Sequence, residues 1–278
     1  MEKSILITGC SSGIGYFVAH ELQKSGYRVF ATARKAEDVE KLSAEGLSAY
    51  PLDLDDSHSI RSGLDWVLSQ TGGTLFALFN NGAYGQPGAV EDLTREALRK
   101  QFETNFFGTQ ELTNLVLPVM RKQGYGRIIH NSSVLGFAAM AYRGAYNASK
   151  FALEGLTDTL RLELADEKNI HISLIEPGPI LSRFRGNALQ ALTKNIDIEH
   201  SVHREKYKGA IARLSKEGAV SAFTLGPEAV LSRVVHALEN PKPKARYYVT
   251  KPTYAFAFLK RLLPISWLDK ILLAAGKD

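Results

Sequence analysis

The chain is 278 residues long, enough for one large α/β domain or two small ones. Apolar residues make up 45% of it and aromatic residues 9%, as expected of a globular protein with a full core. The formal net charge is +5, but residues 241–278 hold eight Lys and Arg against two Asp, so the rest is close to neutral. No basic face with interleaved aromatic residues is visible, which argues against a nucleic-acid partner.

Cysteine and histidine usage limits the chemistry further. Cys10 is the single cysteine, so no intramolecular disulfide can form, which suits a reducing cytosol. No secretory signal precedes the first apolar strand and no run of 18 apolar residues occurs, so we expect a cytoplasmic protein without a membrane span. The seven histidines show no ligand spacing, and no metal site is expected.

Short apolar strands alternate with longer amphipathic helices over residues 1–180. Apolar or β-branched runs with turn-like ends predict buried strands at 4–8, 28–32, 47–52, 75–80, 127–131 and 171–175. Helical periodicity predicts helices at 13–24, 35–44, 57–70, 96–122 and 145–166. Asp92 or Thr94 could cap the fourth of these helices. This order predicts one doubly wound, Rossmann-type α/β domain, with a parallel sheet covered by helices on both faces.

A glycine-rich turn, residues 8–15, follows the first predicted strand and opens the first helix. It reads Thr-Gly-Cys-Ser-Ser-Gly-Ile-Gly. Glycines let the backbone turn sharply and approach a pyrophosphate, whose charge is favourable at a helix N-terminus. We therefore expect six residues of this turn to bind a dinucleotide: Gly9, Ser11, Ser12, Gly13, Ile14 and Gly15. A purely structural tight turn is the alternative, and Cys10 is interpreted as a packing residue rather than a nucleophile.

The second predicted strand ends in Ala33 and Arg34. An acidic residue near this position would bind the ribose hydroxyls of NAD and repel a 2′-phosphate. Arg34 instead favours a 2′-phosphate through a charge-assisted pair, so NADP is the expected cofactor; a solvated arginine at a strand end is the alternative. Asp53 and Leu54 follow the third strand, where Asp53 could accept from an adenine amino group or cap the next helix.

Tyr146 and Lys150 are four residues apart, so on a helix they share one face. A free phenol has a pKa of about 10, and a nearby cation would lower it and make the hydroxyl useful for proton transfer. Ser133 lies near a strand end, where its hydroxyl could hydrogen-bond a substrate oxygen. Taken alone, Tyr-x-x-x-Lys is a weak motif that also fits a solvated helix face.

Taken together, these motifs occur in the order and spacing of one enzyme family. The chain over residues 4–180 resembles the short-chain dehydrogenase/reductase family in its glycine turn, Asn-Asn-Gly-Ala at residues 80–83, Asn105, Ser133, Tyr146, Lys150 and Pro177-Gly178. The resemblance implies that Tyr146 is the general acid/base, with Ser133, rather than Ser132, orienting the substrate oxygen. It also implies that Lys150 binds the nicotinamide ribose and lowers the tyrosine pKa, and that Asn105 holds a proton-relaying water.

The same resemblance implies further cofactor contacts. Asn81, with Gly82 beside it, would lie near the adenosine ribose, and the segment containing Pro177, Gly178, Ile180 and Ser182 near the nicotinamide carboxamide. Two departures from the family pattern occur: Asn-Asn-Gly-Ala stands in place of the usual Asn-Asn-Ala-Gly, and Ser182 in place of a common threonine.

Residues 179–225 would form a lid over the substrate, with helices near 185–192 and 204–214. A helix at 227–239 and a seventh strand at 246–250 would complete a domain over residues 1–251. Residues 252–278 form an apolar, basic extension interrupted by Pro264. This extension could be a helix pair packed on its own domain or on a subunit neighbour, or a surface that contacts a membrane or walls a lipid-like substrate site.

The sequence therefore predicts an NADP(H)-dependent oxidoreductase that interconverts an alcohol and an aldehyde or ketone on a hydrophobic skeleton. The lid and extension resemble those of retinol- and hydroxysteroid-type members, and reduction is the expected direction. Two alternatives stay open: a retinol- or hydroxysteroid-type dehydrogenase working oxidatively, and a catalytically silent NADP-sensing scaffold. A homo-oligomer, dimer or tetramer, is expected through the helices at 96–122 and 145–166, as in many members of this family.

Overall fold

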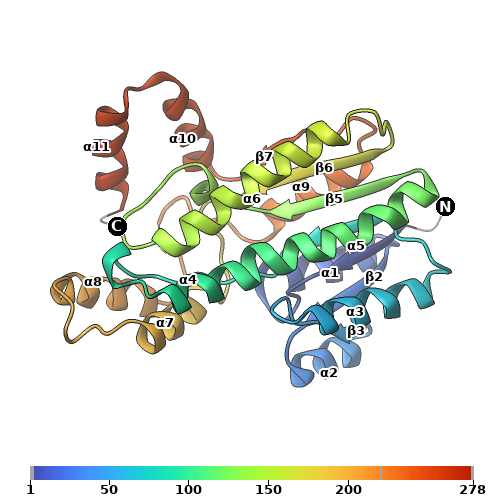
Figure 1. The fold of residues 1–278 in the computed structure, drawn as a ribbon, viewed down its shortest axis with the longest axis horizontal. Coiled ribbons are helices and arrows are strands. Elements are labelled where there is room, and N and C mark those ends of the chain that lie inside the picture. Colours follow the sequence, from blue (N-terminus) through green and yellow to red (C-terminus); the bar gives the residue numbers. More distant parts are fainter. Residues whose placement is uncertain (1–2, 220, 277–278) are drawn as a thin grey trace.

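A seven-stranded parallel sheet with helices on both faces forms the body of the molecule (Figure 1). The computed structural model describes residues 3–219 and 221–276; residues 1–2, 220 and 277–278 of the predicted domain, lid and extension lie outside it. The strands are β1 (Ser4–Ile7), β2 (Arg28–Ala33), β3 (Ser48–Pro51), β4 (Ala77–Asn80), β5 (Gly126–Asn131), β6 (Ile170–Glu176) and β7 (Arg246–Tyr248). Their order is β3-β2-β1-β4-β5-β6-β7, which confirms the predicted doubly wound fold.

Helices follow the strands closely. Their bounds are α1 (Gly13–Lys24), α2 (Ala36–Ala44), α3 (Ser57–Gln70), α4 (Arg95–Phe102), α5 (Gly108–Gln123), α6 (Gly144–Glu163), α7 (Phe184–Asn195), α8 (Arg204–Ser215), α9 (Glu228–Glu239), α10 (Lys251–Leu262) and α11 (Ile265–Ala275). Short 3₁₀ helices occur at Val90–Asp92 and Val134–Gly136. The helix predicted at 96–122 is divided, because a π-helical segment, Glu103–Phe107, separates α4 from α5. Within residues 3–219 and 221–276, no helix is long and apolar enough to cross a membrane.

Alternating side chains of the strands build a separate core on each face of the sheet. On β1, Ile5 and Ile7 contact the core that α1 and α9 cover, whereas Leu6 contacts the core under α3, α5 and α6. This alternation is the period-two pattern of a strand buried on both faces. The chain leaves β1 toward β2 and β3 and then returns to β4 on the other side of β1, so the carboxyl ends of β1 and β4 form the topological switch point.

The lid and the extension stand outside these two cores. Helices α7 and α8 share a small core of their own, centred on Leu192 and Tyr207. Tyr207 fixes this core to the body, since its hydroxyl donates to Asp92 (2.5 Å) and accepts from the Ala89 amide (2.8 Å). Thr94 caps α4 by accepting from Ala97 (3.1 Å). Of the two caps considered, Thr94 therefore serves α4, and Asp92 anchors the lid.

Candidate active site

The glycine turn lies at the switch point and leads straight into α1. Gly9 and Gly13 have φ values of +72° and +62°, which residues with a Cβ rarely adopt. A Cβ on Gly9 would lie 2.7 Å from the Cα of Gly82, and one on Gly15 would collide with the carbonyl oxygen of Gly9. Ser12 is the N-cap of α1, yet its side chain makes no capping hydrogen bond. The first amides of α1 are therefore available to an anionic ligand.

Asn81 joins the carboxyl ends of three strands around this turn. Its side-chain amide donates to the carbonyl oxygens of Thr8 (3.0 Å) and Gly9 (3.2 Å), and its oxygen accepts from Asn131 (2.9 Å). The Thr8 hydroxyl accepts from the amides of Asn81 (3.0 Å) and Gly82 (2.9 Å). These contacts hold the ends of β1, β4 and β5 in a fixed relation, so Asn81 here shapes the backbone that would cradle a cofactor.

Arg34 emerges into solvent at the carboxyl end of β2, directly after the buried Ala33. It has no ion-pair partner among residues 3–219 and 221–276. Tyr84, which the sequence interpretation missed, lies close by: burial raises its pKa to about 12, and the charges of Asp55 and Arg34 act on it in opposite directions. The guanidinium is thus available to an anionic ligand.

Asp53 does not cap the helix that follows it. Its Oδ1 accepts from the Asp55 amide (3.1 Å), and Asp56 is the residue that caps α3 by accepting from His58 (2.8 Å). The cap falls on Asp56 because it immediately precedes the first helical turn. Leu54 is buried, and its Cδ1 would lie 2.9 Å from a Cβ on Gly82. It therefore packs against the backbone beside the glycine turn.

Ser133 and Tyr146 lie side by side beyond the end of β5. The Ser133 backbone is extended, and its hydroxyl accepts from the Leu135 amide (3.1 Å) as the cap of a 3₁₀ helix. The neighbouring Ser132 points elsewhere: a Cβ on Gly136 would lie 2.6 Å from Ser132 Oγ and 3.0 Å from Glu154 Oε1. Successive residues of an extended chain point to opposite sides, and this places Ser133, not Ser132, beside the tyrosine.

Burial has the largest effect on the pKa of the Tyr146 hydroxyl. Its side chain retains some exposed surface, but the surrounding protein raises its pKa to about 12, and hydrogen bonding with Ser133 acts in the opposite direction. The pKa thus lies above its ordinary value, and the expectation that Lys150 acts to lower it stays a prediction. Lys150 Nζ lies 5.8 Å from the centroid of the tyrosine ring and donates to the carbonyl oxygen of Asn131 (2.7 Å).

Lys150 is itself almost fully buried on α6. Burial lowers its pKa to about 8, and the charge of Glu154, one turn further along the helix, acts to raise it. His130 lies on the other side, on β5; burial lowers its pKa to about 3, so it is neutral at physiological pH. The lysine is thus placed between a neutral histidine and an acidic cluster.

That acidic cluster is centred on the guanidinium of Arg246 in β7. Arg246 contacts Glu154 (3.1 Å), Asp158 (2.7 Å) and Glu176 (3.1 Å). One cation faces three carboxylates, and Glu176 is fully buried, so burial and the charge of Glu154 raise the pKa of Glu176 to about 9. Glu176 therefore keeps its proton at neutral pH; burial also raises the pKa of Glu154, while hydrogen bonding with Ser132 and the charge of Arg246 act to lower it.

Asn105 lies in the π-helical segment between α4 and α5. Its side-chain amide donates to the Tyr84 carbonyl (2.9 Å) and to Ser149 Oγ (3.2 Å), and its oxygen accepts from the Tyr84 amide (3.1 Å). The side chain is thus committed to protein contacts beside Lys150, so any water on this residue would have to use its backbone carbonyl. π-Helical turns inside longer helices are frequent at functional sites.

The segment after β6 passes next to the glycine turn. The Pro177 carbonyl accepts from Val134 (2.8 Å), and a Cβ on Gly178 would collide with Thr250 Oγ1. Ile180 packs against the core, and a Cβ on Gly13 would lie 2.9 Å from the Cβ of Ser182. Ser182 is therefore next to the N-terminus of α1 rather than isolated in the lid.

Phe184 is a second site residue that the sequence interpretation missed. Its ring meets that of Tyr146 edge to face, with centroids 5.3 Å apart, and packs on Gly85, where a Cβ would lie 2.8 Å from Phe184 Cζ. The sequence could have indicated this residue, because Phe184 follows the predicted cofactor segment that ends in Ser182 by two positions and begins α7.

The residues at this site fit a nicotinamide dinucleotide. Phosphates could bind the free amides at the start of α1 and the unpaired Arg34. The glycine turn leaves the backbone open to them, because its glycines carry no side chains. Two buried oxygens, Tyr84 Oη and Asn131 Oδ1, lack hydrogen-bond partners within residues 3–219 and 221–276. Cys10 is not a competing nucleophile, since burial raises its pKa to about 12.

Comparison with known proteins agrees with this geometry. The family model described as short chain dehydrogenase matches residues 3–193. The "Uncharacterized oxidoreductase YbbO" of Escherichia coli K12 is 43% identical over 272 residues, covering 98% of this chain and 94% of that protein. Human "Retinol dehydrogenase 8" is 34% identical over 260 residues, covering 88% and 80%. The chain belongs to the short-chain dehydrogenase family and is an oxidoreductase of that family.

A solved structure has the same fold as this chain. A variant of actinorhodin polyketide ketoreductase, crystallised with NADPH, superposes with a TM-score of 0.72 at 27% identity; the match covers 89% of this chain and 95% of the ketoreductase chain.

Proposed function

We propose that this protein is a cytoplasmic NADP(H)-dependent oxidoreductase that reduces an aldehyde or ketone on a hydrophobic skeleton to the alcohol. The observation that carries the proposal is the pairing of Ser133 with Tyr146 next to a buried Lys150, at the carboxyl end of β5. Two hydroxyl groups face one position, and a substrate oxygen there would accept from both.

In this proposal the cofactor supplies the hydride, and the protein positions the substrate and provides the proton. The Ser133 hydroxyl donates to the substrate oxygen and orients it. Tyr146 donates a second hydrogen bond and gives up its proton as negative charge develops on that oxygen. A phenol whose pKa is about 12 holds its proton at neutral pH, which suits the reductive direction. The oxidative direction would need a phenolate to accept a proton, and burial opposes that form.

In the proposed mechanism Lys150 binds the ribose of the cofactor. Its ammonium group is fixed by the Asn131 carbonyl at 2.7 Å, and its remaining N–H groups are donors suited to ribose hydroxyls. With a pKa of about 8, the side chain is largely protonated at neutral pH and is a proton source for Tyr146. The Asn105 backbone, on the other side of Ser149, is the proposed site of a relaying water.

Arg34 supports NADP as the preferred cofactor. Ala33 stands where an acid would favour NAD, and Arg34 next to it is exposed and without an ion pair in the described chain. An unpaired guanidinium gains a bidentate partner from a 2′-phosphate, at no loss of an existing contact. Asp53 Oδ2, free of protein partners in the described residues, would accept from the adenine amino group.

The lid supports an apolar substrate. Phe184 presents its ring to Tyr146, so the space beside the proton donor has an aromatic wall. The name of the relative retinol dehydrogenase 8 indicates an apolar alcohol for that protein. An extended hydrocarbon skeleton gains free energy from burial against such a wall, whereas a short aldehyde gains little.

Initial rates of NADPH consumption with a panel of carbonyl compounds test the proposal. The panel runs from short aldehydes to long-chain, retinoid and steroid carbonyls, with NADH in place of NADPH and the matching alcohols with NADP as comparisons. We expect kcat/KM to favour NADPH and to rise with apolar size. Faster oxidation of the alcohols would support the retinol-dehydrogenase alternative. Cofactor binding without turnover on any compound would favour the sensing scaffold.

We also propose a homo-oligomer formed through α5 and α6. Phe107 and Phe151 are half-exposed large apolar side chains; Phe107 immediately precedes α5, and Phe151 lies on α6. Light scattering with size-exclusion chromatography should give a mass of at least two chains, and a Phe107→Glu variant should lower it. A wild-type monomer at micromolar concentration would contradict this arrangement.

A further inference from the structure

Helices α10 and α11 carry an apolar surface that faces solvent. In Figure 1 the two helices stand away from the sheet and form a hairpin-like projection. None of the residues of α11 is buried, and Trp267 is 62% exposed. Large exposed apolar side chains are concentrated here: Tyr254, Phe258, Leu262, Ile265, Trp267, Ile271 and Leu273. We call these seven residues the tail surface. An apolar patch of this kind on a folded chain marks an interaction site.

The tail surface is not the loose end of an unpacked segment, because the helix pair also has a buried inner side. Phe256 of α10 is buried against Val134 and Ala138, and Leu272 of α11 packs on the same cluster. Lys260 Nζ donates to the Phe137 carbonyl (2.7 Å) and holds α10 on the chain that follows Ser133. The extension therefore packs on its own domain through Phe256 and Leu272 and leaves the tail surface exposed.

Cations accompany the apolar residues. Lys251, Lys260, Arg261 and Lys270 are exposed, against the single acid Asp269 in the described part of the two helices. Lys251, Arg261 and Lys270 have no ion-pair partner within residues 3–219 and 221–276. Apolar and aromatic side chains next to lysine and arginine on short helices are typical of segments that lie in the interface of an anionic bilayer.

We propose that α10 and α11 dock the protein on an anionic lipid surface, with the tail surface in the headgroup region and the cations on lipid phosphates. A second copy of the chain fits less well. A two-fold interface places the same patch against itself, so the exposed cations of both copies would gather in one interface, with Asp269 as the one acid that each copy supplies from the described part of these helices.

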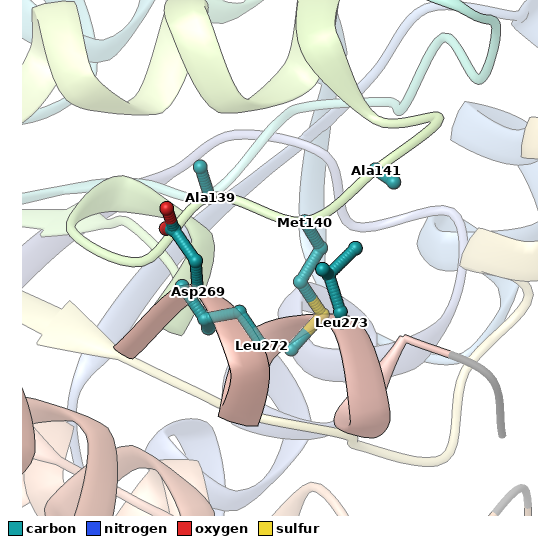
Figure 2. A pocket seen from close by; sticks show the side chains of 6 residues that line it. All are labelled: Ala139, Met140, Ala141, Asp269, Leu272 and Leu273. Atoms are coloured by element: carbon teal, nitrogen blue, oxygen red, sulfur yellow. The ribbon is translucent and has the colours of Figure 1, made fainter. Parts of the chain in front are cut away.

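Docking there would place the lipid next to the proposed active site. A pocket lies between α11 and the loop that joins Ser133 to Tyr146, lined by Ala139, Met140, Ala141, Asp269, Leu272 and Leu273. Figure 2 shows the Met140 side chain directed toward Leu272 and Leu273. If the proposed function holds, an apolar substrate could pass from the bilayer to the loop around Tyr146 without crossing water.

Vesicle flotation with the full chain tests the proposal. Phosphatidylcholine vesicles with and without about one-third phosphatidylglycerol are the probes, at low and at high salt. We expect flotation with the anionic vesicles alone, and loss of it as salt rises. Trp267→Glu and the double variant Arg261→Glu/Lys270→Glu should each reduce the bound fraction about tenfold or more. Val202→Glu, at an apolar lid residue that is 85% exposed, and Lys122→Glu are the matched controls and should float as the wild type does.

The vesicle result does not depend on turnover, so it fails or succeeds separately from the proposed function. Trp267→Glu should reduce a short, water-soluble carbonyl at the wild-type rate if that function holds, because Trp267 lies outside the site. Wild-type protein that stays unbound with anionic vesicles at low salt would overturn the proposal. So would a wild-type oligomer that Trp267→Glu dissociates without any effect on flotation, since the tail surface would then be a contact between copies.

Discussion

The ring of Phe184 meets the ring of Tyr146 edge to face, with centroids 5.3 Å apart and planes at 65°. Phe184 is the first residue of the lid helix α7, and Tyr146 lies in the first turn of α6. One contact therefore joins the lid to the proposed proton donor. In the proposed function, this contact would couple selection for apolar substrates to proton transfer.

Removal of the Phe184 ring should weaken selection for apolar size. We expect Phe184→Ala to lower kcat/KM for long-chain carbonyls by roughly tenfold to a hundredfold, because a buried aromatic contact is lost, and to change that for short aldehydes little. Steady-state kinetics on both substrates give the ratio. Phe223→Ala, at a half-exposed lid residue, is the control. Equal losses on short and long substrates would show that Phe184 does not select for size.

Arg34 should decide between the two nicotinamide cofactors. Arg34→Ala is expected to raise KM for NADPH by about tenfold or more, since a charge-assisted pair is lost, and to leave KM for NADH unchanged. Lys35→Ala is a matched control, because the Lys35 ammonium already pairs with Glu37 at 3.1 Å. A parallel rise for both cofactors would place Arg34 outside the 2′-phosphate site.

Glu154 should set the basic limb of the pH profile. Lys150, with a pKa of about 8, loses its proton as pH rises, and the charge of Glu154 delays that loss. Glu154→Gln keeps the shape but removes the charge, so the limb in kcat/KM should move to lower pH. The other groups facing Lys150 are the neutral His130 and Tyr146. Asp158→Asn is the control. Asp158 also pairs with Arg246 but lies farther along α6 from Lys150, so this variant should leave the basic limb in place. An unmoved limb in Glu154→Gln would contradict this coupling.

Glu176 should make stability depend on pH. Its folded-state pKa of about 9 lies above the ordinary value, so between about 4.5 and 9 the folded chain holds a proton that the unfolded chain has lost. The free energy of unfolding should therefore fall with rising pH, by at most about 1.4 kcal/mol per pH unit from this group. Glu176→Gln stays neutral and should flatten this slope in urea denaturation, whereas the exposed Glu163→Gln should not. If Glu176→Gln kept the wild-type dependence of the unfolding free energy on pH, that dependence would come from other groups.

The elements of the fold could be predicted because their signals are local. Helices α1 and α3 begin and end where periodicity placed them, at Gly13–Lys24 and Ser57–Gln70. The same holds for the glycine turn, since three glycines at one strand–helix junction reflect a backbone requirement that is visible in the residues themselves.

Properties set by distant contacts could not be predicted in this way. The pKa of Tyr146 rises because residues from several elements enclose it, and no spacing in the sequence reports that enclosure. Phe184 reaches Tyr146 across 38 positions, and the π-helical turn at Asn105 interrupts a continuous helical periodicity. The extension packs on its own domain through Phe256 and leaves Trp267 exposed, and its contact with a membrane stays a prediction.

One measurement tests the central claim most directly: the rate of carbonyl reduction by NADPH in wild-type protein and in Tyr146→Phe, with NADPH affinity measured in parallel. The variant keeps the ring that contacts Phe184 and lacks only the hydroxyl. The account predicts a loss of about 10²- to 10⁴-fold in kcat, with the Kd for NADPH unchanged. A variant that reduces the same carbonyl at a rate close to wild type would contradict it, because the proton would then come from another group.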